Sequence, residues 1–104
     1  MSMVECKRTP KADICGTHKV GSITTTMSKL MDIFGSPEPY HGIDEKVQYQ
    51  WTLTFEEDGN QYLATIYDWK EYRELYMDET IEWSIGGHHS MAHILVHDFI
   101  EGSN

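Results

Sequence analysis

Apolar and polar residues alternate most regularly in the middle of the chain. From Val47 to Glu56 every second side chain is apolar, a period of two that is typical of a β-strand with one buried face. The turn sequence Glu-Asp-Gly-Asn follows at 57–60, and residues 61–69 form a second apolar run, so the two runs predict an antiparallel hairpin. Shorter apolar runs at 14–23 and 81–85 predict two further strands.

Two other segments have helical spacing instead. Apolar residues recur at i, i+3, i+4 and i+7 from Met27 to Phe34, directly after three threonines that can cap a helix, and Gly35 is a natural helix terminator. A final helix is expected from position 88 or 90 to 101. The apolar residues of its inner face are Met91, Leu95 and Phe99.

The resulting order of elements, β-α-β-β-β-α, predicts the α+β fold class, with an antiparallel sheet of three to four strands and two helices packed on one face. Residues 1–13 are polar and show neither period, so we expect a flexible N-terminal arm, followed by a single domain at 14–104. Segments 36–46 and 70–80 are expected to be loops. The sheet face without helices would then be free for a ligand or a second subunit.

Composition narrows the classes of partner. A chain of 104 residues forms a small core, so oligomerisation would help it, and its net charge of -9 disfavours binding to a nucleic-acid polymer or an anionic membrane. No apolar run has the length of a membrane span. Cys6 and Cys15 are expected to be free thiols, because no secretory leader pattern precedes them and a cytoplasmic location is therefore expected.

The residues with distinctive chemistry are concentrated at 65–70 and 82–89. Large rings with polar groups lie there beside charged residues and a glycine pair, a mixture that suits a binding surface better than a plain buried strand. We expect the ligand-binding residues to be Tyr67, Asp68, Trp69, Lys70, Arg73, Trp83, Gly86, Gly87 and His88.

Three of these residues have alternative interpretations. Gly86 and Gly87, placed before a helix, either bind a phosphate through free backbone amides or simply turn the strand into the helix. Asp68 either accepts hydrogen bonds from a ribose or a base amine, or forms an ion pair with Lys70 or Arg73.

His89, His93 and His97 recur at every fourth position of the final helix. Two such histidines could chelate zinc, but the sequence lacks a Cys-x-x-Cys or His-Glu-x-x-His pattern beside them, so we expect solvent-facing histidines and no metal site. The chain shows no nucleophile with an adjacent base and no phosphate-loop pattern. We therefore expect no catalytic residues and no cofactor.

Several short motifs together resemble those of a group of small phage and virus proteins. They are the three threonines at 24–26, Phe34-Gly35 with Pro37, Trp51, Thr-Ile-Tyr-Asp-Trp-Lys at 65–70, and Glu-Trp at 82–83 with Ile-Gly-Gly at 85–87. The resemblance extends from about residue 21 to 102. Members of this group are often accessory or counter-defence factors, and some sequester nucleotide signals of bacterial immunity. The resemblance thus implies a viral accessory protein in the host cytoplasm.

Two functional hypotheses follow. The first is a non-catalytic protein that binds and sequesters a small nucleotide-like ligand between aromatic faces. The second is an acidic inhibitor or DNA mimic that docks on a host protein through Glu71, Glu74, Asp78 and Glu79. We also expect a homodimer or higher homo-oligomer, because Tyr62, Tyr72, Tyr76 and Trp83 have no obvious cover in so small a chain.

Overall fold

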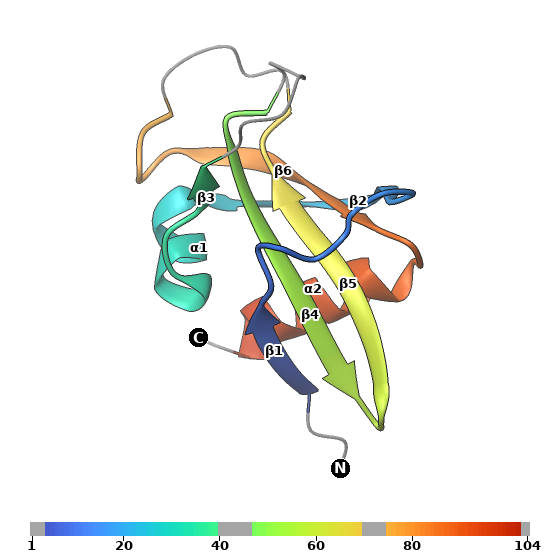
Figure 1. Cartoon of the computed structure of the whole chain (residues 1–104). Coiled ribbons are helices and arrows are strands. Elements are labelled where there is room, and N and C mark those ends of the chain that lie inside the picture. Colours follow the sequence, from blue (N-terminus) through green and yellow to red (C-terminus); the bar gives the residue numbers. More distant parts are fainter. Residues whose placement is uncertain (1–3, 40–46, 70–74, 103–104) are drawn as a thin grey trace.

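The computed structural model describes residues 4–39, 47–69 and 75–102 of the chain (Figure 1). These residues form a mixed α+β structure. In chain order the elements are β1 (Val4–Arg8), β2 (His18–Thr26), α1 (Met27–Phe34), β3 (Glu38–Pro39), β4 (Tyr49–Glu57), β5 (Asn60–Tyr67), β6 (Thr80–Gly87) and α2 (Met91–Gly102).

Five strands form one antiparallel sheet in the order β1-β4-β5-β6-β2, and the two-residue strand β3 pairs with β4 beside it. The α+β class and the antiparallel sheet are thus confirmed. The predicted number of three to four strands is too low, and the predicted order lacks β1 and β3. Both strands are short, and neither has enough apolar residues to produce a clear period of two on its own.

The first helix and the hairpin form where the local sequence predicts them. The Thr26 hydroxyl accepts a hydrogen bond from the Lys29 amide at 3.1 Å and caps α1, and Gly35 ends the helix at φ 85°. Between β4 and β5, Asp58 and Gly59 both have positive φ, 52° and 84°. This two-residue turn matches the right-handed twist of the paired strands.

The hydrophobic core lies between the sheet and α2, with α1 closing one side (Figure 1). Phe34 of α1 and Phe99 of α2 stack with ring centroids 5.7 Å apart. Trp51 and Trp83 meet edge to face at 5.5 Å, and both are fully buried. The prediction that Trp83 lacks cover is therefore wrong: its position on the inner face of β6 places it in the core.

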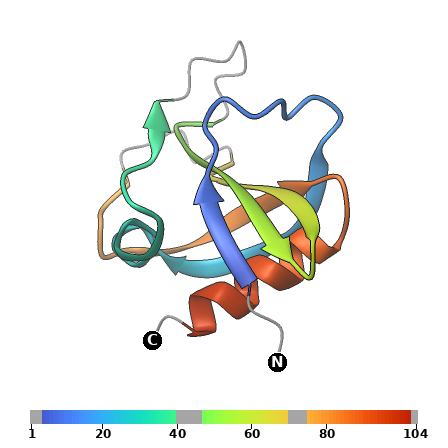
Figure 2. The ribbon, with the colours of Figure 1, turned by 60° about the horizontal axis from the view of Figure 1, so that its bottom comes forward.

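The opposite face of the sheet is partly covered by residues 9–17, which connect β1 to β2. Figure 2 shows this connection on one side of the sheet and α2 on the other. Thr9 anchors the connection, because its amide donates to the Thr52 carbonyl at 2.9 Å and its hydroxyl lies 2.9 Å from that of Thr54. The segment that we expected to be a flexible arm thus contains a paired strand and part of a second layer.

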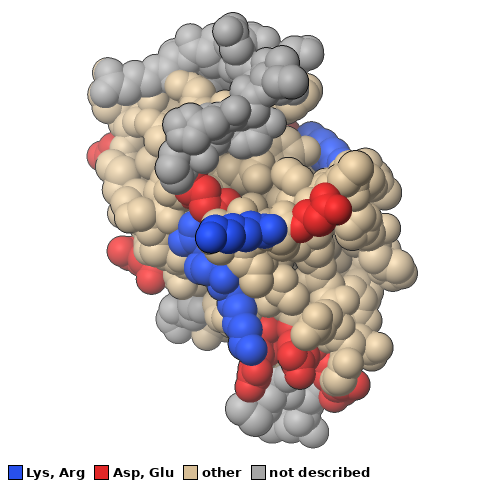
Figure 3. Space-filling model, viewed as in Figure 1, with Lys and Arg blue, Asp and Glu red and all other residues tan. Residues whose placement is uncertain are grey.

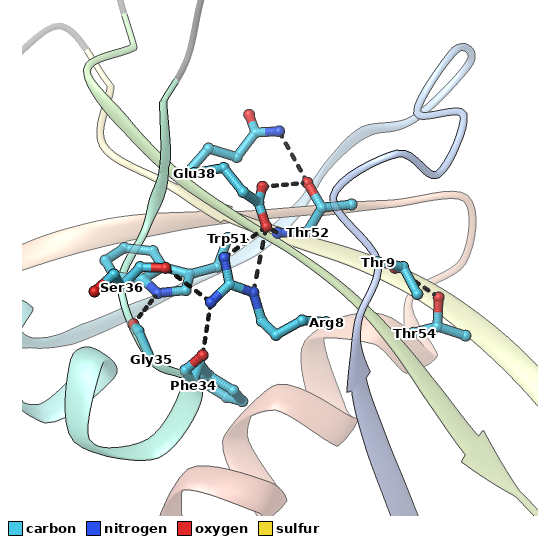
Figure 4. A network of polar contacts seen from close by, with 10 residues as sticks. Arg8, Thr9, Phe34, Gly35, Ser36, Glu38, Trp51, Thr52 and Thr54 are labelled. Atoms are coloured by element: carbon cyan, nitrogen blue, oxygen red, sulfur yellow. Dashed lines mark hydrogen bonds and ion pairs between the residues drawn. The ribbon is translucent and has the colours of Figure 1, made fainter.

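A polar network fixes β1 to α1 and β4 (Figure 4). The Arg8 guanidinium donates to the carbonyl oxygens of Phe34 and Ser36 at 2.7 and 2.8 Å, and it pairs with the Glu38 carboxylate at 2.8 Å. Glu38 in turn accepts hydrogen bonds from the Thr52 amide and hydroxyl at 2.9 and 2.8 Å. The end of α1, β3 and two strands therefore meet at one ion pair, which anchors the N-terminal strand.

Candidate ligand-binding site

Two adjacent hollows lie on the sheet face opposite α2. The Gln50 hollow has a volume of about 150 Å³ and the Lys19 hollow about 330 Å³. The Gln50 hollow is lined by Ile14, Thr17, His18, Val47, Gln50, Thr65, Tyr67, Trp69 and Gly86. The Lys19 hollow is lined by Lys19, Tyr67, Trp69 and Ser84. Because Tyr67 and Trp69 line both hollows, one ligand can occupy them together.

Tyr67 and Trp69 form the aromatic wall between the hollows. Their ring centroids lie 6.2 Å apart at an interplanar angle of 78°, and Trp69 is 42% exposed. Burial raises the pKa of Tyr67, so its phenol keeps its proton at neutral pH and can donate a hydrogen bond. An indole ring at the surface is a group on which a planar ligand can stack.

The floor of the Gln50 hollow is polar although it is buried. Gln50 and Thr65 project from neighbouring strands, and the Gln50 amide donates to the Thr52 hydroxyl at 3.2 Å. A carboxamide has a second N–H donor and an acceptor oxygen, the pair of groups that reads the edge of a nucleobase. The site thus combines a ring face with directional polar groups.

Neither hollow has an Asp or Glu among the residues that line it in the described part of the chain, although the chain has 17 acidic residues. Lys19 is the cationic side chain of the larger hollow. The lining therefore favours a neutral or anionic ligand over a cation.

Gly86 and Gly87 lie inside β6 and not at a helix start. Gly86 pairs with Thr65 on one side and with Lys19 on the other, and α2 begins only at Met91. A Cβ atom at Gly86 would lie 2.6 Å from the Thr65 hydroxyl, so glycine lets this strand pack closely and shapes the wall of the Gln50 hollow. The expected position of Gly86 and Gly87 at a helix start is therefore wrong, because both residues are paired with neighbouring strands of the sheet.

Asp68 is fully buried and belongs to the scaffold. Its carboxylate accepts hydrogen bonds from the amides of Gln48 and Tyr49 at 2.8 and 2.7 Å and from the Gln48 side chain at 3.1 Å. These bonds hold the start of β4 against the end of β5. Asp68 therefore positions the aromatic wall from behind and does not line either hollow.

The remaining predicted residues are dispersed. Trp83 faces the core, Gly87 packs against Ala92, and His88 is exposed outside both hollows. Lys70 and Arg73 lie outside the described residues. Of the nine predicted ligand-binding residues, the structure thus brings Tyr67, Trp69 and Gly86 together at one site.

The histidines of α2 do not form a solvent-facing stripe. His93 and His97 are half-buried with ring centroids 4.5 Å apart, and His97 Nε2 lies 2.8 Å from the Ser22 carbonyl of β2. His89 precedes α2 and is the one exposed member of the predicted three, and its Nδ1 accepts from the Met91 amide at 3.0 Å. The expectation of solvent-facing histidines fails for the two that pack on β2. No group of three or more potential metal ligands occurs within the described ranges.

Sequence reasoning did not identify Gln50, Thr65 and Lys19 as residues of the candidate site. The polar residues that alternate with apolar ones along the first hairpin strand indicated a hydrophilic sheet face, and Gln50 belongs to that face. Lys19 had no such signal, because its orientation depends on an irregularity in β2 that appears only once the strands are paired.

The surface charges bear on the acidic-inhibitor hypothesis. Figure 3 shows blue and red atoms interspersed on the visible face, which is not uniformly acidic. Asp78 is exposed and Glu79 half-buried in the described loop, whereas Glu71 and Glu74 lie outside the described residues. Of the four carboxylates on which the acidic-inhibitor hypothesis depends, the structure therefore describes two.

None of the described helices is long and apolar enough to cross a membrane. Comparisons of the chain with protein-family models, with curated proteins and with solved structures found no match.

Proposed function

We propose that this chain is a non-catalytic binding protein that takes a small nucleotide-like ligand into the Gln50 and Lys19 hollows. The observation that carries the proposal is the shared aromatic wall: Trp69, which is 42% exposed, lies beside Tyr67 and near the buried Gln50 and Thr65 side chains. Stacking on such a face is tolerant of the base, and the Gln50 carboxamide supplies hydrogen bonds to its edge.

The size of the site limits the ligand. Pockets for drug-sized molecules usually have volumes from about 300 to 1,000 Å³. The Gln50 hollow, at about 150 Å³, is well below this range, and the Lys19 hollow, at about 330 Å³, is at its lower end. A single base with its sugar therefore suits the described surface better than a long oligonucleotide does.

The biological setting comes from the resemblance to small phage proteins. In the proposed role, the protein is a viral accessory factor in the host cytoplasm that sequesters a nucleotide signal of host defence. Sequestration requires binding without chemical change. The ligand should therefore be recovered intact from the complex, which liquid chromatography with mass spectrometry can check.

The test is a panel of nucleosides and nucleotides, measured by thermal shift and calorimetry with the wild type, Trp69→Ala and Ile94→Ala. Stacking contributes about 1–3 kcal/mol per base, so Trp69→Ala should weaken binding at least about fivefold. Ile94 is 46% exposed on α2, outside both hollows, and its replacement should leave affinity unchanged. No stabilisation at millimolar concentration, or equal losses in both variants, would refute the proposal.

We also propose a homodimer. Tyr76 and Met77 are 65% and 46% exposed, so apolar surface is available for a second copy of the chain. Light scattering from low micromolar to high micromolar concentration tests this proposal, and a monomer mass throughout would exclude the dimer.

A further inference from the structure

A β-bulge in β2 determines which way Lys19 points. In the pairing of β2 with β6, Gly21 lies opposite Ile85, but Lys19 lies opposite Gly86, so Val20 is an extra residue in the ladder. Without this shift Lys19 would share the face of Gly21 and Ile23, because side chains alternate strictly along a strand. That face packs against the core and α2.

With the bulge, Lys19 falls on the opposite face, together with Gly86 and Ser84. Bulges often re-aim side chains beside binding sites. Here the result is that Lys19 lines the Lys19 hollow together with Tyr67 and Trp69, the aromatic residues that also line the Gln50 hollow. The local backbone irregularity thus places a cation beside the proposed base site.

We infer that the ligand of the proposed site carries a phosphate, and that Lys19 binds it while the base occupies the Gln50 hollow. This inference rests on the proposed function and adds the substrate class, a nucleoside monophosphate. A lysine is a compact cation with three N–H donors, and the Ser84 hydroxyl lining the same hollow supplies a fourth. Each group is a suitable partner for phosphate oxygens.

The charge balance explains why one phosphate suffices. Lys19 is the one cation in the described lining of its hollow, and the chain carries a net charge of -9. A second or third phosphate adds negative charge without a further cationic partner in this lining. Triphosphates should therefore bind no more tightly than monophosphates.

The experiment measures adenosine, guanosine, cytidine and uridine, their 5′-monophosphates and their 5′-triphosphates by calorimetry. The proteins are the wild type, Lys19→Gln, Lys19→Arg and Lys7→Gln. Lys7 is exposed on β1 outside both hollows. Lys7→Gln therefore changes the net charge as much as Lys19→Gln does, without altering either hollow. Circular dichroism and thermal melting confirm that each variant is folded.

We expect the best monophosphate to bind about tenfold more tightly than its nucleoside, as one charge-assisted contact allows. Lys19→Gln should remove most of this difference without changing nucleoside affinity, and Lys19→Arg should retain it. Lys7→Gln should change nothing, and added salt should reduce the monophosphate preference.

The outcomes separate the two proposals. Equal affinities for nucleoside and monophosphate, or equal effects of Lys19→Gln and Lys7→Gln, would overturn the phosphate inference while the binding function stands. Tighter binding of triphosphate than monophosphate would overturn the stated ligand class. No binding of any compound would overturn both proposals.

Discussion

Gly21 offers a direct test of how α2 packs on the sheet. It lies in β2 beneath His93, and a Cβ atom at Gly21 would lie 2.2 Å from Cδ2 and 2.4 Å from Cγ of that imidazole. Cγ is the atom that joins the ring to the rest of the side chain, so turning the ring about its own axis cannot relieve the contact. In Gly21→Ala, either the His93 rotamer or the helix must move.

The expected loss of stability follows from two opposing effects. Overpacking a closely fitted site costs about 1–3 kcal/mol, and the short distances here favour the upper half of that range. Replacing glycine reduces the entropy of the unfolded chain and recovers about 0.4–1 kcal/mol. The net loss should be about 1.5–2.5 kcal/mol, which corresponds to a decrease in Tm of about 10 °C for a domain of this size.

A double-mutant cycle in urea measures this effect with Gly21→Ala, His93→Ala and the combined variant. In the combined variant the methyl group added at position 21 occupies space vacated by the imidazole, so the two losses should fall short of additivity by more than about 1 kcal/mol. Gly102→Ala is the matched control, because within the described residues no atom beyond its chain neighbours and its own helix backbone lies within 4 Å of the added Cβ. Additive losses, or a wild-type Tm for Gly21→Ala, would refute this packing of α2 on β2.

Two further predictions concern buried groups. Asp68→Asn should lower the free energy of unfolding by about 1–3 kcal/mol, because an N–H₂ group replaces one of the two oxygens that accept hydrogen bonds from Gln48. Nucleotide affinity per folded molecule should stay constant; urea denaturation and calorimetry check this, and lost affinity at unchanged stability would make Asp68 a ligand contact. Burial raises the pKa of Cys6 from 9.0 to about 11, so at pH 8 its thiolate should be about a hundredfold scarcer in the folded chain than in the unfolded one. Iodoacetamide should label exposed Cys15 quickly and Cys6 only slowly until urea is added; equal native rates would contradict this environment.

Local sequence was sufficient to predict the elements whose caps, stops and turns lie within or next to the element itself. The cap at Thr26, the stop at Gly35 and the Asp-Gly turn each act within a few residues, so α1 and the β4–β5 hairpin were predictable. β1 was not, because its assignment depends on pairing with β4 far along the chain. Its two inward apolar residues, Val4 and Cys6, are too few to show a pattern.

The candidate site could be predicted only in part, because some of its residues are brought together by the pairing of strands that lie far apart in the sequence. Aromatic density directed attention to the end of β5, where Tyr67 and Trp69 line the hollows. Whether a particular polar residue is exposed is decided by strand pairing. Asp68 lies between two residues of the site, and the alternation of side chains places it on the opposite face, with buried Ala64 and Ile66. Its bonds to Gln48 could not be predicted, because Gln48 lies twenty residues earlier in the chain.

The strand order also has a consequence for how the chain folds during synthesis. β2 lies at one edge of the described sheet, and its partner there, β6, follows about sixty residues later. At about 5–20 residues per second, β2 therefore waits about 3–12 s after its own synthesis. β1 must similarly wait for β4. The β4–β5 hairpin closes locally and can provide the template onto which the other strands add. Non-local pairing of this kind slows folding, and it leaves the apolar side of β2 exposed on the nascent chain until the second half of the protein has emerged from the ribosome.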